Sequence, residues 1–492
     1  MSTHVIWAPQ GANIAWDGDT PGLALIAWPL TALVGPIVSF NLLTLSAPVL
    51  AALATYFLCY ELTQKFWPSL FGGWIFGFST YEMAQLLGHL QVNFIAEVPL
   101  LLWLAVLRYR GRIGTPLFVT AVALLLTFEF GVGVELYTTT AVFSALGLLV
   151  SLLFIKGSRG AITRIAGELA GAYAASLLLI SPYLYFFIRS ASGVPPIINS
   201  PLRYSADLLN FFTPTPVTAL GGPLLSGVTK HFSGNLAEND AYLGLPLMVI
   251  VCFFLWRGRR QRWVLVLAVA FLLVVIAELG PRLHILGTTN LAVGVVRLPW
   301  DLATKVPGLR DALPGRFAMY LSLLAAVIGS LWLSSLGRYR LVGIALALAA
   351  VAFLWPNPLT VTTPPPVRLL STRAYLTVLG QRSTLLFLPY GQLGDSMLWQ
   401  AQDGFDYRLA SGTGTVEPAS FAKSPTVEML FSGQRPPGYL EDLLTFCHQH
   451  DVTAILVTAG TASSIREAIA HLGWRGRPFG SDRLYWAPAP AK

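Results

Sequence analysis

Charge is what this sequence has least of. Only 11% of its 492 residues are Asp, Glu, Lys or Arg, whereas 54% are hydrophobic. A soluble domain carries roughly 25% charged residues. A chain of this size would therefore have too little polar surface for a water-soluble globule. The shortage predicts that lipid is a second solvent and that the chain is an integral membrane protein.

Cysteine and recognisable enzyme motifs are also scarce. The three cysteines, Cys59, Cys252 and Cys447, are scattered and odd in number, which argues against a disulfide framework or a zinc knuckle. The sequence has no Walker A loop, no GxGxxG, no HExxH and no CxxC pair, so an ATP-driven pump is not expected. The net charge of +8 comes from short basic clusters between apolar runs, which indicates membrane topology rather than nucleic-acid binding.

Apolar runs that are long enough, or nearly so, to cross about 30 Å of hydrocarbon recur up to residue 355. Segment 22–34 is too short to span, and we expect it to be an interfacial helix that is broken near Pro29. The ten predicted spanning helices lie near 36–60, 68–86, 92–107, 115–131, 133–155, 166–188, 241–256, 263–280, 316–335 and 341–355.

Lysine and arginine cluster in every second connection, whereas 87–91 and 131–134 contain neither residue. The positive-inside rule then places the basic connections on the cytoplasmic side of the membrane. The basic connections are 108–112, 156–164, 257–262 and 337–340. The segments predicted to lie outside are the loops 1–35, 190–240 and 281–315 and everything after residue 355.

Composition changes after the membrane region. Residues 356–367 form a Pro-rich linker, and 368–492 resemble a soluble domain. Its predicted strands are 383–389, 452–458 and 483–487, and its predicted helices are 438–450 and 461–472. The predicted fold class is thus an all-α polytopic membrane bundle, residues 1–355, with a small C-terminal α/β extracytoplasmic domain.

Polar side chains gather at the predicted outer turn 81–94. Glu82 and Gln85 lie one helical turn apart on the same face, and His89 follows them. His89 is suited to be a metal ligand or a general acid or base. The alternative is an interfacial histidine that is hydrogen-bonded to the backbone.

Further carboxylates lie at other outer turns. Glu129 and Glu135 flank the turn between two spans, where a charge is costly unless it is paired or functional. They are candidates for a divalent metal site or a base, against the alternative of a solvated turn. Asp17 and Asp19 lie in the N-terminal segment, where the sequence DGD is also typical of a plain turn.

Arginines mark the segment 297–316, which leads directly into a span. Arg297, Arg310 and Arg316 alternate there with acidic residues such as Asp301. Arginine pairs bidentately with phosphate, so this segment is a candidate site for a lipid phosphate. The alternative is snorkelling side chains and loop salt bridges.

Three stretches carry a family resemblance: HVIWAPQG…CYELT (4–63), GGWIFGFSTYEMAQLLGHLQ (72–91) and PGLRDALPGRF (307–317). They resemble bacterial membrane glycosyltransferases of the GT-C superfamily, including YfhO-like members. Members of that superfamily begin with a transmembrane helix followed by an acidic loop. This sequence begins in a segment that is predicted to lie outside, so the resemblance implies that the first transmembrane helix is missing from it.

The resemblance implies hexosyl or pentosyl transfer from a polyprenyl-phosphate donor to an envelope glycan, lipid or protein at the outer membrane face. A divalent metal, Mg or Mn, would be held by Glu135 and His89. The implied catalytic residues are Asp17, Asp19, Glu135 and His89. The implied substrate-binding residues are Glu82, Gln85, Arg297, Asp301, Arg310 and Arg316.

Two other functions compete with glycosyl transfer. The first is a non-catalytic envelope protein, in which the bundle anchors a C-terminal domain that binds a glycan or a partner. The second is a secondary transporter. The sequence argues against the transporter, because it shows no paired halves with interrupted helices and its polar residues lie away from the midplane.

Overall fold

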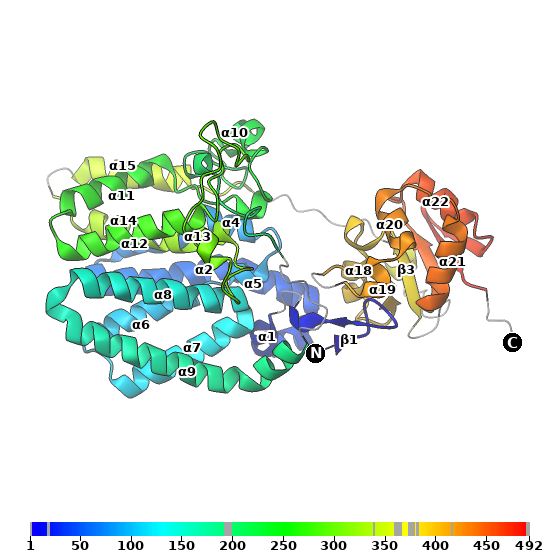
Figure 1. Cartoon of the computed structure of the whole chain (residues 1–492), viewed down its shortest axis with the longest axis horizontal. Coiled ribbons are helices and arrows are strands. Elements are labelled where there is room, and N and C mark those ends of the chain that lie inside the picture. The colour runs from blue at the N-terminus through cyan, green and yellow to red at the C-terminus, as the bar shows by residue number, and fades with distance from the viewer. Residues whose placement is uncertain are drawn as a thin grey trace.

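The computed structural model describes residues 2–16, 20–190, 199–337, 340–358, 367–371, 379, 383–414 and 417–488. Helices of the N-terminal part form a bundle of roughly parallel and antiparallel rods, and a smaller α/β unit follows it along the chain (Figure 1). The principal helices of the bundle are α1 (Pro21–Val34), α2 (Pro36–Thr63), α3 (Phe66–Gly77), α4 (Thr80–Gln85), α5 (Leu90–Asn93), α6 (Glu97–Tyr109), α7 (Thr115–Val132), α8 (Val134–Phe154), α9 (Arg159–Arg189), α11 (Leu245–Gly258), α12 (Arg262–Glu278), α14 (Ala318–Ser334) and α15 (Arg340–Phe353).

These helices make the chain a multi-pass membrane protein. In the described part of the chain, six helical stretches are both long and apolar enough to cross a bilayer. Each of the ten predicted spans contains a helix, but only these six meet the length and hydropathy expected of a span, so the count of ten stays a prediction. The six are 36–63, 90–109, 115–132, 134–154, 156–189 and 314–334.

Two local predictions were wrong. The predicted break at Pro29 does not occur, because α1 continues through Pro29 to Val34. It is followed by Gly35, whose φ of 81° only glycine adopts readily. The predicted single span 68–86 is two helices. The side chain of Ser79 accepts a hydrogen bond from the backbone of Glu82 at 3.3 Å and so caps a new helix, α4.

The C-terminal unit is a five-stranded sheet of order β4-β3-β5-β7-β6, covered by helices that include α20 (Pro425–Ser432), α21 (Tyr439–Gln449) and α22 (Ser463–Ala470). β3 is parallel to β4 and β5, whereas β7 is antiparallel to β5 and β6. The three predicted strands are confirmed as β3 (Thr384–Leu388), β5 (Val452–Val457) and β7 (Asp482–Trp486). Prediction missed β4 (Arg408–Leu409) and β6 (Arg475–Phe479).

The N-terminal segment joins the two parts. The backbone N–H of Trp7 donates to the carbonyl of Ser411 at 3.0 Å, beside β4, and the Trp7 ring lies in the core of the C-terminal unit. A few residues later, the side chains of Asn13 and Trp16 donate to carbonyls at the end of α9, at 3.1 and 3.0 Å. The segment therefore pairs with the sheet and contacts the bundle at once (Figure 1).

Close packing of α2 against α3 depends on glycine. A Cβ atom on Gly77 would lie 2.4 Å from the carbonyl oxygen of Pro48 and 2.5 Å from the Cβ of Ala52. Small residues at such contacts let helix backbones approach each other closely inside a membrane.

We predict that Gly77→Val lowers the stability of the bundle by about 1–3 kcal/mol, since overpacking forces the helices apart. Thermal unfolding of the purified protein in detergent would show the loss as a lower melting temperature. Gly171→Val in α9 is the matched control, because a Cβ there meets no atom within 4 Å. Equal melting temperatures for the two variants would contradict this account of the α2–α3 contact.

Candidate active site

The two ends of the bundle differ in how their acidic side chains are paired. At the end with the basic connections, Arg110 and Arg112 bind the carboxylate of Glu61 at 2.9 and 2.6 Å. Arg108 likewise binds Glu168 at 2.6 Å. Acidic side chains at this end therefore have arginine partners.

At the opposite end, hereafter the carboxylate end, acidic residues outnumber their partners. The order of the helices along the chain brings these acids together. Each helix that starts at a basic connection ends at the carboxylate end, and the next helix starts there. These seven carboxylates are Glu82 in α4, Glu97 at the start of α6, Glu129 near the end of α7, Glu135 at the start of α8, Glu238 and Asp240 before α11, and Glu278 at the end of α12.

Arg316, in the 3-10 turn η5 (Pro314–Phe317), is held by two of the seven. Its Nη1 donates to Glu135, and its Nη2 donates to Glu238 at 2.7 Å. Its Nε lies 3.1 Å from both oxygens of Glu238. The backbone N–H of Leu313 donates to the other oxygen of Glu135 at 2.7 Å. The donors of Arg316 are thus already engaged by protein carboxylates.

The other carboxylates are buried without such partners. Within the described residues, neither oxygen of Glu82, Glu97 or Glu278 has a hydrogen-bond partner, and one oxygen each of Glu129 and Asp240 has none. Unpaired ionised groups are costly to bury. Several such groups together are typical of a functional site, where protonation or a bound ligand compensates them.

His89 lies beside this cluster in a defined orientation. Its Nδ1 is 3.0 Å from Oε1 of Gln85, while Nε2 of Gln85 donates to the carbonyl of Ala237 at 2.7 Å and faces Asp240 at 3.4 Å. Because those contacts fix the Gln85 amide with its oxygen toward His89, Nδ1 is the ring nitrogen that carries the proton. Nε2 of His89 is then a free base.

Burial keeps this imidazole neutral. It lowers the pKa of His89 below its ordinary value, Glu238 opposes that shift, and Arg316 adds to it. A neutral, half-buried histidine with an unprotonated Nε2 has the form that a general base requires.

The remaining predicted site residues lie elsewhere or cannot be placed. Asp17 and Asp19 are outside the described residues. Arg297 and Asp301 form an exposed pair at 4.0 Å, and Arg310 lies 3.4 Å from its neighbour Asp311. The structure therefore brings together the predicted Glu82, Gln85, His89, Glu135 and Arg316, and leaves Arg297, Asp301 and Arg310 on the loop before η5.

The predicted metal site is not formed by the described side chains. Glu135 is bonded to Arg316 and Leu313, and His89 faces Gln85. Among all the residues that can be placed, no three His, Cys, Asp or Glu side chains are grouped to hold a metal ion.

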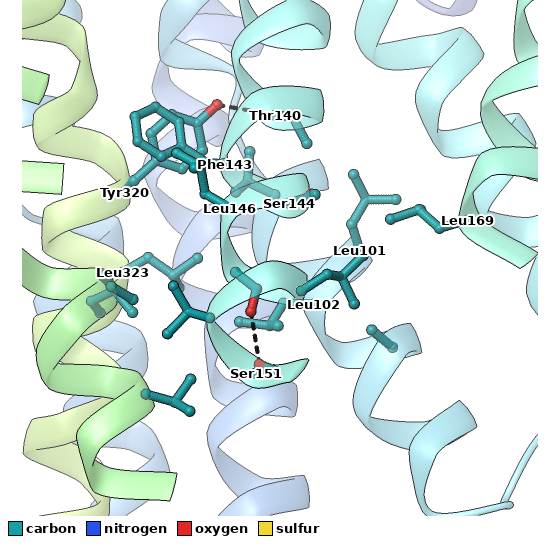
Figure 2. Close-up of a pocket in the computed structure, with 18 of the residues that line it drawn as sticks. Leu101, Leu102, Thr140, Phe143, Ser144, Leu146, Ser151, Leu169, Tyr320 and Leu323 are labelled. Carbon is teal, nitrogen blue, oxygen red and sulfur yellow. Dashed lines mark hydrogen bonds between the residues drawn. The ribbon is translucent and has the colours of Figure 1, made fainter. Parts of the chain in front are cut away.

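An apolar groove runs along the membrane-embedded part of the bundle. It has a volume of about 340 Å³ and lies between α6, α7, α8, α9, α12 and α14. Leucine side chains such as Leu101, Leu102 and Leu146 project into it, and Thr140 and Tyr320 lie at one end (Figure 2). The groove has the size and lining of a site for an elongated apolar ligand.

The polar end of the groove leads to the carboxylate end. Thr140 donates to Glu129 at 2.6 Å, and Thr140 also lies 3.1 Å from the hydroxyl of Tyr320. Tyr320 lies one helical turn after Arg316. A row of aromatic contacts continues beyond the groove, since Phe317 packs on Phe143 of the groove at 5.1 Å and on Trp300 of the loop before η5 at 4.6 Å.

Four of the seven carboxylates were absent from the predicted site. Glu97 and Glu278 each lie at one end of an apolar run, and Glu238 and Asp240 directly precede another. The same signal that identified Glu135, a carboxylate at the edge of a span, was therefore present for them. What no local pattern showed was that Glu238 binds Arg316.

We predict that Arg316→Ala destabilises the protein by about 3–5 kcal/mol, because it leaves Glu135 and Glu238 buried without a cation. Arg297→Ala should change stability by less than about 0.5 kcal/mol, since its pair with Asp301 is exposed. Thermal unfolding in detergent compares the two variants. Similar losses in both would show that Arg316 does not stabilise the carboxylate end.

Asp240 gives a pH-dependent prediction. Burial raises the pKa of its carboxyl well above the ordinary value, Glu238 adds to the rise, and Gln85 opposes it. The neutral carboxyl of Asp240 contributes fully to stability at any pH below its pKa in the unfolded chain. This contribution is lost as the pH rises through its pKa in the folded protein. We expect Asp240→Asn to gain melting temperature over the parent as pH rises from about 4 to about 9.

The control for this series is Asp395→Asn, whose side chain is exposed in the C-terminal unit. Its melting temperature should follow that of the parent at every pH. A constant difference between Asp240→Asn and the parent across the pH range would mean that Asp240 is not protonated on folding.

Comparison with known proteins adds the fold relationship. No curated protein matches the chain. The archaeal oligosaccharyltransferase AglB from Archaeoglobus fulgidus, solved with an inhibitory peptide and a dolichol-phosphate, is 11% identical with a TM-score of 0.52, over 99% of this chain and 68% of that one. The arabinofuranosyltransferase AftD from Mycobacteria is 13% identical with a TM-score of 0.53, over 99% of this chain and 36% of that one.

The chain thus shares the fold of AglB and AftD, although it spans little more than a third of AftD. Residues 1–355 match a family model with the description "Domain of unknown function (DUF6311)". Since this match covers more than half of the sequence, the protein belongs to the DUF6311 family.

Proposed function

We propose that this protein is a membrane glycosyltransferase that moves a sugar from a polyprenyl-phosphate donor to an acceptor of the bacterial cell envelope. The observation that carries the proposal is the apolar groove that ends at the carboxylate end, where His89 offers a free ring nitrogen beside buried acids. The fold shared with AglB, which was solved with a dolichol-phosphate, supports a lipid-linked donor. The carboxylate end would face the outside of the plasma membrane.

The groove suits the hydrocarbon part of such a donor. Its lining is largely leucine, valine and alanine, and Thr140 and Tyr320 are polar groups at its end toward the carboxylates. A polyprenyl chain lying in it would remove apolar surface from contact with water and would leave its phosphate near the level of Arg316. This orientation directs the sugar toward the buried carboxylates and His89.

Charge on the departing phosphate would be met by the outer loop rather than by Arg316. Arg316 is buried between two carboxylates. Arg297 and Arg310 are exposed, each with a single acidic neighbour, on the loop that Trp300 attaches to Phe317. Positive charge at a developing phosphate anion lowers the barrier to its departure. We assign to Arg316 the role of fixing Glu135 and Glu238, which it contacts directly.

In the proposed reaction, the bond from the anomeric carbon of the sugar to the donor phosphate breaks, and a bond to an acceptor hydroxyl oxygen forms. The hydroxyl proton passes to Nε2 of His89. Gln85 holds the histidine in the required tautomer. Asp17 and Asp19, outside the described residues, stay candidates for a further catalytic acid or base. The transferred sugar is a hexose or a pentose.

The test is sugar transfer by membranes that contain the full chain, supplied with radiolabelled polyprenyl-phosphate hexoses and pentoses. His89→Ala should lower the rate by about 10²–10⁴-fold, the usual contribution of a general base. His231→Ala, a surface histidine of the loop after helix α10 (Gly222–Thr229), should leave the rate unchanged. Transfer that survives His89→Ala at the parental rate would refute the assignment of His89, and no transfer from any donor would refute the function.

A further inference from the structure

A second apolar hollow borders α4, the short helix that carries Glu82 and Gln85. Its volume is about 330 Å³, and its lining includes Leu45 and Val49 of α2, Met83 and Leu86, Val217 and Pro356. Asn357 is the polar side chain of the lining, and its Nδ2 already donates to the carbonyl of Pro216 at 2.9 Å. The hollow thus offers an apolar surface and almost no hydrogen-bonding group.

The hollow opens at the membrane boundary. On α2, Leu45 and Val49 are 61% and 57% exposed, as expected of a face that contacts lipid. Trp355 lies two residues after the end of α15 and is 57% exposed, and its carbonyl accepts a hydrogen bond from the backbone N–H of Ala219 at 2.8 Å. Exposed tryptophans at the ends of spans are typical of the membrane–water interface. An occupant at this level would come from the adjacent lipid leaflet.

Helix α4 connects the hollow to the proposed active site. Met83 and Leu86 face the hollow, whereas Gln85 on the same short helix contacts Ala237 and Asp240 and orients His89. His89 follows Leu86 by only three residues. A lipid whose chain lies against Leu86 would therefore present its headgroup close to His89.

From this geometry we propose that the hollow binds an acyl chain of an outer-leaflet lipid, and that this lipid is the sugar acceptor. The proposal rests on the proposed glycosyl transfer and names its acceptor class. A lipid is favoured over a protein partner because the hollow is flanked by lipid-facing residues of α2 and lacks free polar groups. The donor chain takes the other groove, so the two lipids would approach the carboxylates from opposite sides of the site.

The first experiment measures lipid occupancy without activity. The purified full chain is placed in nanodiscs that contain phosphatidylglycerol with a photoactivatable acyl chain, and labelled peptides are mapped by mass spectrometry. Label should concentrate at 45–49, 83–86 and 217. Val49→Trp should lower it by about tenfold, a loss of binding equal to 1.4 kcal/mol. Leu53→Trp, one turn further along the lipid-facing side of α2 and outside the lining, should not.

Equal labelling of Val49→Trp and Leu53→Trp, or label spread evenly over the lipid-facing helices, would overturn the lipid site. This readout is independent of catalysis, so the hollow can be shown to bind lipid even if no sugar transfer is found. In that case the proposed glycosyltransferase function is wrong, and so is the proposed role of the lipid as sugar acceptor.

The second experiment assigns the lipid its role in the reaction, with the same phosphatidylglycerol offered as acceptor in liposomes. Val49→Trp should raise KM for the acceptor lipid by about tenfold and leave KM for the polyprenyl-phosphate donor unchanged. Leu146→Trp in the large groove should raise KM for the polyprenyl-phosphate donor and leave KM for the acceptor lipid unchanged. If Val49→Trp leaves the acceptor KM unchanged or raises the donor KM instead, the hollow is not an acceptor site.

Discussion

The low dielectric of a membrane-embedded bundle is the constraint on which this structure depends. In that medium a carboxylate needs a cation, a proton or a hydrogen-bond donor. Arg316 supplies the cation for Glu135 and Glu238, and so ties together α8, the turn before α11 and the turn before α14. The remaining acids around it lack such partners in the described part of the chain, which makes this end of the bundle the candidate active site.

The surrounding elements fit a reaction between two lipids at that place. The large groove and the hollow behind α4 both end at the level of the carboxylates, and both have apolar linings. Between them, the Gln85 amide orients His89 toward a single tautomer. The loop that carries Arg297 and Arg310 lies at the same end, because its Trp300 packs on Phe317. Binding energy from two apolar chains could thus hold two reacting headgroups together.

The C-terminal unit is attached to this end by more than its linker. Residues around Trp7 pair with the strand β4, while Asn13 and Trp16 of the same segment bond to the end of α9. Gly412 leaves room for the indole of Trp7, since a Cβ there would lie 2.6 Å from it. The N-terminal segment therefore sets where the sheet sits relative to the bundle.

The sequence by itself determined the membrane class, the alternation of basic and acidic ends, and three strands of the C-terminal sheet, because hydropathy and charge are sums over neighbouring residues. It also placed Glu82, Gln85, His89, Glu135 and Arg316 near outer turns. Only the tertiary structure decided that Glu238 binds Arg316, 78 residues away, and that α4 faces both a hollow and the acids. Such pairings depend on how helices cross in space, and no local pattern encodes a crossing.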